Sequence, residues 1–242
     1  MVDLDTQENT ETILGFHDIS GKFDFSINTI PSGQLNSIID FISENKPVKI
    51  SFLFDDGYAS VLEFKEKLVP FQPKISIITN FIGKTSNWDT RMGGTGKSHL
   101  TVSQIRELQQ SGWKILSHSH LHHALDQLSA EKLKTDLETS KKTLENITGS
   151  EITGLSLPFG RFDNRVIEIA NEAGFRHFYS NKASNPVQNI DRSFSVYRWE
   201  GNPSVKRKIE RNQLELLKLK SINFCSLGTV LMQKLFYEEI HD

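Results

Sequence analysis

Short apolar segments alternate along this chain with longer segments whose apolar residues recur at helical spacing, and this alternation constrains the fold more than any other feature. Several short segments are apolar at nearly every position, as in strands that are buried on both faces. Regular alternation of such strands with helices is typical of a parallel sheet with helical crossovers. The predicted strands are residues 48–54, 74–79, 113–117 and 175–179, and the predicted helices are residues 35–45, 102–111, 130–148 and 164–173.

Three of these helices carry capping signals at their ends. Thr101 and Gln104 have the spacing of a capping box, in which each side chain accepts a hydrogen bond from the other residue's backbone N–H. Glycine readily adopts the left-handed conformation that ends many helices, and one follows each of the three. The other predicted N-caps are Ser129 and Asp163, and the closing glycines are Gly112, Gly149 and Gly174.

The chain of 242 residues is long enough for one large domain, since α/β barrels commonly reach about 250 residues as a single unit. We expect residues 1–12 to form a disordered tail, residues 13–203 the main domain, and residues 204–242 a helical extension packed on it. Within the main domain, residues 83–99 are rich in Gly, Ser, Thr and Asn and are predicted to form a long surface loop.

Composition narrows the classes of function. The chain has 28 Lys and Arg against 30 Asp and Glu, a net charge of −2 and a pI near 6.5. The basic excess that drives nucleic-acid binding is missing, so we expect no nucleic-acid partner. Cys225 is the single cysteine, which excludes an internal disulfide and a thiolate zinc cluster.

The sequence also bears on location. It shows no basic segment followed by an apolar stretch at its start, and no apolar run near the roughly 18 residues of a membrane span. We expect a cytoplasmic protein, with a removed leader as the alternative. Six basic residues among residues 206–220 indicate a solvated helix face, or alternatively a helix that contacts a membrane surface or a partner. Oligomeric state is left open.

Two adjacent acidic residues, Asp55 and Asp56, follow the predicted strand 48–54. Adjacent residues leaving a strand point in opposite directions, so one carboxylate could bind a metal while the other faces a reacting water. The alternative is an ordinary turn, because Asp and Gly are common turn residues and Gly57 comes next.

A histidine cluster follows the predicted strand 113–117. Residues 118–123 contain four of the chain's eight histidines. His118 and His122 are four residues apart, a spacing that places both imidazoles on one side of a helical turn. Two imidazoles and a carboxylate are a common ligand set for a catalytic zinc-like ion. A polar loop with surface histidines is the alternative, but barrel enzymes place their sites at the carboxyl ends of strands.

A third motif, Pro158-Phe159-Gly160, closes another short apolar segment and precedes a predicted helix. Such a segment is often only a turn. It could also direct a backbone N–H toward an oxyanion that develops during a reaction.

In their order along the chain, Phe54-Asp55-Asp56-Gly57, the His118/His122 pair and Pro158-Phe159-Gly160 resemble the motifs of polysaccharide deacetylases with a NodB-homology domain, carbohydrate esterase family four. The resemblance covers roughly residues 13–200. It implies a distorted (β/α) barrel, here followed by a C-terminal helical segment, and makes residues 13–203 the catalytic domain.

The resemblance also implies roles for single residues. Asp56, His118 and His122 would hold one divalent metal ion, most often zinc, with cobalt, nickel or iron as alternatives. Asp55 would be the general base for a water activated by the metal. The Phe159 backbone amide, in the turn that begins at Pro158, would help stabilise the oxyanion.

Two departures from the family pattern concern the base and the acid. The arginine that often precedes the Pro-aromatic turn and orients the base is replaced by Ser156. The late Leu-x-His motif that supplies the acid is missing, because His241 is the penultimate residue. Residues 15–19, however, resemble the opening segment of a permuted subgroup in which an early histidine is the acid. This resemblance makes His17 the predicted acid, with a hydrogen-bonded structural histidine as the alternative.

Other side chains are weaker candidates for a role in the site. Arg198 could replace the missing arginine, or it could lie at the surface. Trp199, Trp88 and Tyr58 could offer faces for stacking on sugars, although aromatic side chains are more often part of a core.

Taken with the resemblance, the sequence predicts a metal-dependent hydrolase that removes N-acetyl groups from amino sugars of a glycan or glycan precursor. Its partner would be an N-acetylated saccharide, and the apparent lack of a leader favours a cytoplasmic saccharide or a lipid-linked intermediate. Two alternatives stay open: a deformylase or small amide or imide hydrolase of the same fold, and a carbohydrate-binding barrel without turnover.

Overall fold

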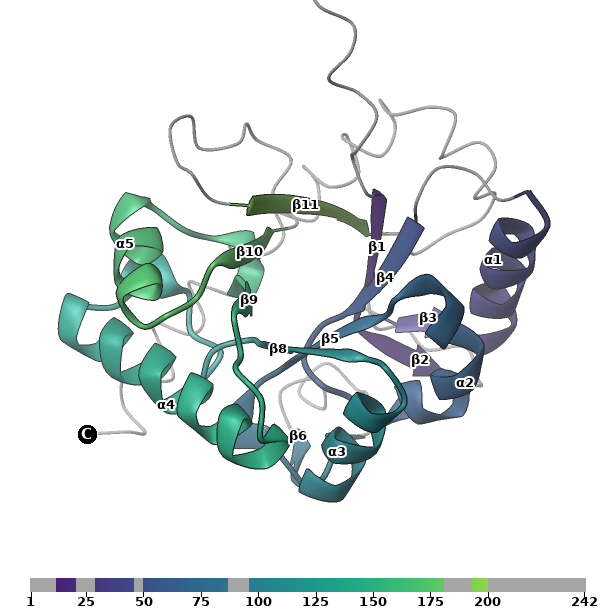
Figure 1. Ribbon diagram of the computed structural model, residues 1–242, viewed down its shortest axis with the longest axis horizontal. Coiled ribbons are helices and arrows are strands. Elements are labelled where there is room, and N and C mark those ends of the chain that lie inside the picture. The colour runs from purple at the N-terminus through teal and green to yellow at the C-terminus, as the bar shows by residue number, and fades with distance from the viewer. Residues whose placement is uncertain (1–11, 21–28, 46–49, 87–95, 181–192, 200–242) are drawn as a thin grey trace, which may run out of the picture.

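Parallel strands close into a seven-stranded barrel in the computed structural model, which describes residues 12–20, 29–45, 50–86, 96–180 and 193–199. The order around the barrel is β1-β11-β10-β9-β8-β5-β4, and β4 pairs with β1 to close it. This arrangement confirms the predicted (β/α) barrel (Figure 1). The strands are β1 (Thr12–Phe16), β4 (Ile50–Phe54), β5 (Lys74–Ile77), β8 (Lys114–Ser117), β9 (Gly154–Ser156), β10 (His177–Ser180) and β11 (Ser193–Trp199).

The described helices lie along the outside of the barrel (Figure 1). The α-helices are α1 (Ser32–Asn45), α2 (Lys65–Leu68), α3 (Val102–Gln110), α4 (Ala130–Thr148) and α5 (Asn164–Glu172). Short 3-10 helices are η2 (Ala59–Phe64), η3 (Val69–Phe71), η4 (Thr79–Phe81), η6 (Leu125–Gln127) and η7 (Pro158–Gly160). Two small sheets add β2 (Asp18–Ser20) beside β3 (Thr29–Pro31), and β6 (Thr85–Ser86) beside β7 (Lys97–Ser98).

The helix caps are as the sequence predicts. Thr101 and Gln104 form a reciprocal capping box at the start of α3. Ser129 and Asp163 accept hydrogen bonds from the first turns of α4 and α5. Gly149 ends α4 in the left-handed conformation, with φ at 66°. These local signals fix where each crossover helix begins relative to the preceding strand.

The period-two pattern of the strands produces two apolar cores. One lies between the barrel and the helices and includes Phe52 and Phe54 of β4. The other is a small buried cluster with one residue from each of four strands around the barrel, so it fills the barrel interior. Its members are Ile13, Leu53, Leu116 and Tyr179. The barrel is therefore plugged by side chains, and polar groups can gather only above or below this plug.

The segment 83–99, predicted as one long surface loop, departs from that prediction. Thr85 and Ser98 pair in the antiparallel β6–β7 ladder, and Gly83 N–H donates to Leu100 O at 2.9 Å. His99 is buried, with 3% of its surface exposed. A composition of small polar residues indicates a loop, but backbone hydrogen bonds between the two ends draw His99 inward.

Several predictions fall outside the described residues. These are the disordered tail up to residue 11, the start of the strand predicted at residues 48–54, and the helical extension with its basic run at residues 206–220. The domain boundaries therefore stay predictions. Among the described helices, none combines the length and the apolar character that crossing a membrane requires.

Gly154 tests the barrel plug. A Cβ atom at this position would lie 2.4 Å from Leu116 Cδ2 and 3.5 Å from Tyr179 Cε2, so the interior has no room for it. We expect Gly154→Ala to lower the free energy of unfolding by about 1–3 kcal/mol, as overpacking usually does. Chemical denaturation measures the change. Gly33→Ala is the control, because nothing lies within 4 Å of its added Cβ; equal stability of the two variants would contradict the close-packed interior.

Candidate metal centre and active site

Asp56, His118 and His122 come together at the carboxyl ends of the barrel strands. Asp56 Oδ1 lies 3.4 Å from His118 Nε2 and 3.5 Å from His122 Nε2. One ligand atom from each residue falls within 4.8 Å of the other two. The structure thus assembles the predicted ligand set from segments more than 60 residues apart in the sequence.

These residues fit a divalent cation. Asp56 Oδ1 is buried and has no hydrogen-bond partner in the structure. A buried carboxylate oxygen without a partner is costly, and its distances to the two imidazole nitrogens exceed those of a good hydrogen bond. A cation between one carboxylate and two neutral imidazoles would satisfy all three groups, and this donor set suits zinc.

The charges of the site favour a cation as well. Burial alone would raise the pKa of Asp56, but contact with His118 and the nearby charges of His17 and His122 outweigh it, so the pKa lies well below its usual range. Burial lowers the pKa of His122 to about 3, and this imidazole is therefore neutral at physiological pH. For His118, burial is outweighed by the charges of Asp55 and Asp56, which raise its pKa.

The two histidines do not share a helical turn, contrary to the prediction. Ser119 and His122 have positive φ values of 66° and 59°, so residues 118–122 form an irregular loop. His122 N–H donates to Ser119 Oγ at 2.9 Å, and Ser119 N–H donates to Ser117 Oγ at 3.1 Å. Short-range side-chain hydrogen bonds, not helical periodicity, therefore bring the two imidazole rings to a centroid distance of 4.9 Å.

Asp136 of α4 holds this histidine loop in place. Its carboxylate accepts from His120 N–H at 2.8 Å and from Leu121 N–H at 2.9 Å. Burial raises its pKa despite these two hydrogen bonds. Sequence reasoning missed this residue, although an acidic residue beside Leu133 and Leu137 on the inner face of an amphipathic helix is a usable signal.

His118 is oriented by a backbone carbonyl. Its Nδ1 donates to Ser156 O of β9 at 2.8 Å, which directs Nε2 toward Asp56. Hydrogen bonding of the second ring nitrogen is the usual way in which a metal-ligating histidine is held in one tautomer.

Asp55 lies beside this ligand set and is almost completely buried, with 1% of its surface exposed. Its backbone N–H donates to Phe16 O at 2.8 Å, which fixes the end of β4 against β1. Its Oδ1 accepts from Ser156 Oγ at 2.8 Å and from Ser76 Oγ. The two adjacent aspartates therefore have different partners, as the strand-end geometry predicts.

His17 reaches the same end of the barrel. Phe16 of β1 pairs with Phe54 of β4, so the next residues, His17 and Asp55, are neighbours. The charge of His17 acts on both Asp56 and His122. Its Nδ1 is buried without a hydrogen-bond partner in the structure, unlike that of a structural histidine held at this atom.

Asp18, which follows His17, anchors this stretch. Lys97 Nζ lies 3.1 Å from Asp18 Oδ2, and Ser60 Oγ donates to Asp18 Oδ1 at 2.7 Å. Both charged side chains are close to 90% buried. Because a buried, hydrogen-bonded pair resists movement, it restrains the backbone from which His17 projects.

The Pro158-Phe159-Gly160 turn forms η7 at the end of β9. Phe159 has a φ of 57°, and its ring packs on the His122 ring at a centroid distance of 4.7 Å. The turn is closed by Gly160 N–H and Arg161 N–H, and neither bond uses the N–H of Phe159. A paired, bidentate contact between Arg161 and Asp126 holds the following residues.

His99 is a second residue that sequence reasoning missed. Its Nδ1 lies 2.9 Å from Asp56 O, and its ring packs between Tyr58 and Phe81 at centroid distances of 4.7 and 5.1 Å. Asp56 has a φ of 70°, which is unusual for a residue other than glycine. His99 supports this strained backbone. The histidine lay in a segment whose composition indicated a surface loop.

Tyr58 is not a sugar-stacking platform. Only 2% of its surface is exposed, so the core interpretation of this aromatic residue holds. Trp88 lies outside the described residues. Arg198 and Trp199 belong to β11, whose backbone is described but whose side chains are not, so both stay predictions.

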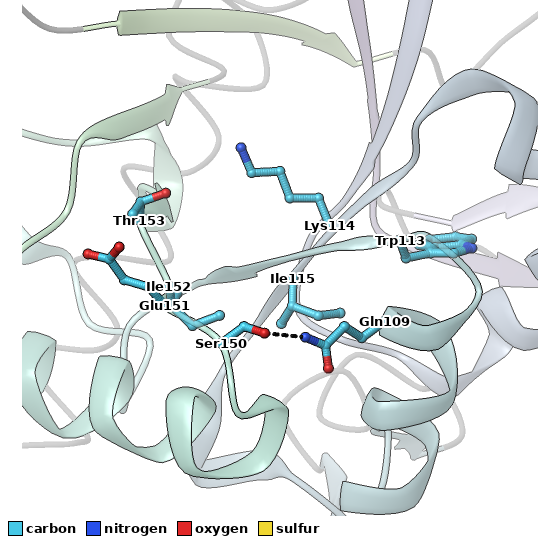
Figure 2. Close-up of a pocket in the computed structure, with 8 residues that line it drawn as sticks. All are labelled: Gln109, Trp113, Lys114, Ile115, Ser150, Glu151, Ile152 and Thr153. Carbon is cyan, nitrogen blue, oxygen red and sulfur yellow. Dashed lines mark hydrogen bonds between the residues drawn. The ribbon is translucent and has the colours of Figure 1, made fainter.

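A pocket of about 180 Å³ lies at the opposite end of β8 (Figure 2). Gln109 and Lys114 line it, and Gln109 donates to Ser150 Oγ at 3.0 Å, the dashed line in Figure 2. Lys114 begins β8, whereas His118 directly follows its last residue. None of the predicted site residues lines this pocket.

Comparison with known proteins points to one family. Residues 43–178 match the family model described as polysaccharide deacetylase. A Bacillus subtilis protein named "Putative polysaccharide deacetylase YxkH" is 26% identical over 123 residues, which are 51% of this chain and 41% of that protein. The match therefore spans less than half the length of this relative.

Solved structures share the fold at low sequence identity. A polysaccharide deacetylase from Bacillus cereus superposes with a TM-score of 0.68 at 16% identity, covering 84% of this chain and 69% of that one. The Streptococcus pyogenes deacetylase PplD, solved in complex with acetate, gives a TM-score of 0.64 at 17% identity, covering 83% and 96%.

The role of Asp136 can be tested by removing its carboxylate. Asp136→Ala leaves two backbone N–H groups without their acceptor, at a cost of about 1–3 kcal/mol for each. We expect a less stable protein whose metal affinity falls by about 10- to 100-fold, because the histidine loop loses its anchor. Calorimetric metal titration measures this. Glu138→Ala removes an exposed carboxylate from the same helix; similar metal affinities in the two variants would contradict the anchoring role.

Protons should compete with the metal at His118. Because the pKa of His118 is raised, the imidazole becomes protonated as pH falls through that value, and an imidazolium cannot bind a metal. We expect zinc affinity to rise with pH below the raised pKa of His118, with about one proton released per ion, and to level off above that pKa. Competition with a chromophoric chelator measures the affinity.

A variant separates this protonation effect from unfolding of the protein at low pH. Asp55→Asn removes a charge that raises the His118 pKa, so the rise in affinity should move to lower pH. Affinity that is flat over the whole range, or a rise that is unmoved in Asp55→Asn, would contradict the assignment.

Proposed function

Because this chain belongs to the polysaccharide deacetylase family, we propose that it removes N-acetyl groups from amino sugars of a glycan or glycan precursor with the help of one divalent metal ion. The observation that carries the proposal is the convergence of Asp56, His118 and His122, with Asp55 buried directly beside them. We propose zinc as the ion, with cobalt, nickel or iron as alternatives.

The proposed reaction is hydrolysis of an amide. A divalent cation held by these three residues would lower the pKa of water and polarise the amide carbonyl. Asp55 would accept the proton of the attacking water, whose oxygen bonds to the carbonyl carbon. The carbon–nitrogen bond then breaks, and the products are acetate and a free amine on the sugar.

Two further groups would complete this chemistry. The Phe159 N–H, which does not close its own turn, is available to donate to the developing oxyanion. His17 would donate a proton to the departing nitrogen, since an amine is a poor leaving group without one. The place of His17 beside Asp55, together with its unpartnered Nδ1, supports membership of the permuted subgroup.

The proposal also includes a class of substrate. A cytoplasmic saccharide or lipid-linked intermediate is part of the proposal and depends on a cytoplasmic location. Peripheral membrane contact through residues 206–220 would suit a lipid-linked substrate. Both ideas rest on the sequence alone.

Acetate release from acetylated chito-oligosaccharides tests the proposed activity. The purified protein should contain about one divalent ion per chain and should release acetate in a chelator-sensitive way. Asp55→Asn should lower kcat by about 100- to 10,000-fold, the usual contribution of a positioned base, and His118→Ala should lose the ion. Glu151→Gln removes an exposed carboxylate at the opposite end of the barrel and should leave kcat unchanged.

Two substrates with different leaving groups test the proposed role of His17 as the acid. His17→Ala should impair the release of acetate from the sugar far more than the hydrolysis of 4-nitrophenyl acetate, whose phenolate departs without a proton. Equal losses on both substrates would contradict the role of His17. Sugar binding without acetate release would favour the binding barrel, and cleavage of a formylated or cyclic amide would favour the alternative hydrolase.

A further inference from the structure

We propose that Ser76 and Ser156 are positioning residues, which orient the Asp55 carboxylate toward the ligand set through a pair of hydroxyl donors. This inference rests on the proposed function of Asp55 as the base. It adds two residues, from β5 and β9, whose hydroxyls bind neither the metal nor the substrate in the proposed mechanism but act through the base.

Both hydroxyls bind the same oxygen. Ser156 Oγ donates to Asp55 Oδ1 at 2.8 Å, and Ser76 Oγ donates to the same atom. Aspartate has only two side-chain torsions, so two donors that arrive from different strands determine the direction of the whole carboxylate. The two serines are fully buried, with 0% of their surfaces exposed.

The apolar plug makes the two bonds difficult to replace. Leu53 lies two residues before Asp55, on the same face of β4, and belongs to the cluster that fills the barrel interior. Ser76 pairs in register with Leu116, another member of this cluster. The hydroxyls therefore sit directly above packed side chains, where bulk water does not reach, and a lost hydroxyl leaves the carboxylate oxygen without that donor.

Ser156 couples the base to the metal centre. Its hydroxyl donates to Asp55 while its carbonyl accepts from His118 Nδ1 at 2.8 Å. One residue thus sets the relative positions of the base and of a metal ligand. Because the carbonyl belongs to the backbone, a change of the Ser156 side chain removes the first bond and keeps the second.

Threonine and valine variants separate the hydroxyl from the shape of the side chain, because the two residues have nearly the same volume. We expect Ser156→Val and Ser76→Val each to lower kcat for acetate release by about 10- to 100-fold, the effect common for partners that orient site residues. KM and the metal content should stay at wild-type values. Ser156→Thr and Ser76→Thr retain the hydroxyl and should stay within about threefold of the wild-type kcat, by the same reasoning.

Ser51→Val is the matched control. Ser51 is a buried serine on the same face of β4, four residues before Asp55, and its hydroxyl accepts from Lys74 at 2.7 Å. This variant should lose stability without a comparable loss of kcat. If a valine variant does not fold, alanine at the same position replaces it, with the same expected loss.

Crystal structures of the valine variants give a readout that does not depend on activity. The Asp55 side chain should turn away from its wild-type torsions, while the His118 to Ser156 hydrogen bond persists. Wild-type kcat in both valine variants, loss of the metal, or an equal loss in the threonine variants would overturn the proposal. If the wild-type protein releases no acetate, the proposed function fails, and unchanged Asp55 torsions would then overturn this inference separately.

Discussion

The structure depends on one buried carboxylate oxygen. Asp56 Oδ1 lies between two imidazole nitrogens at 3.4 and 3.5 Å without a hydrogen-bond partner. An uncompensated negative charge in such a place would destabilise the fold, so the surrounding residues must either carry positive charge or bind a cation. A cation shared by the carboxylate and the two imidazoles is the compensation that this donor set suits best. Asp56 also has a strained backbone with a positive φ, and His99 supports this backbone through its contact with Asp56 O. Both features help to hold the carboxylate in this position.

The remaining polar groups form a shell that directs the side chains near this oxygen. Asp136 holds the histidine loop, the Ser156 carbonyl orients His118, and the Ser156 and Ser76 hydroxyls hold Asp55. Leu53 and Leu116 of the apolar plug lie beneath Asp55 and Ser76, whereas Asp136 lies beside Leu133 and Leu137 of the outer core. In a site without bulk water, each hydrogen bond is stronger and each missing one costs more. The barrel therefore contributes rigidity and dryness to the site, and the loops at the strand ends contribute its chemistry.

The sequence predicts the barrel and the three residues that converge at its carboxyl end, but not the contacts that support them. Strand patterns and caps such as the Thr101 capping box are local signals, and they place the strand ends at which Asp56 and His118 appear. The His118/His122 spacing predicted that these two imidazoles lie together, but through a wrong geometry, because the loop is held by Ser119 and not by helical periodicity. Asp136 and His99 act across 16 and 43 residues, and local patterns do not record such distant hydrogen bonds. Ser156, at the position where the resemblance leads us to expect an arginine, was visible in the sequence, but its bond to Asp55, 101 residues away, required the structure.

We propose that the orphaned oxygen of Asp56 and its two imidazole neighbours bind one cation. Anomalous X-ray scattering from crystals grown with zinc tests it most directly. We expect a single strong peak about 2.0–2.2 Å from Asp56 Oδ1, His118 Nε2 and His122 Nε2, the normal range for zinc bonded to oxygen and nitrogen. A zinc-loaded crystal with no peak between these three atoms, or with Asp56 turned away from both imidazoles, would contradict it.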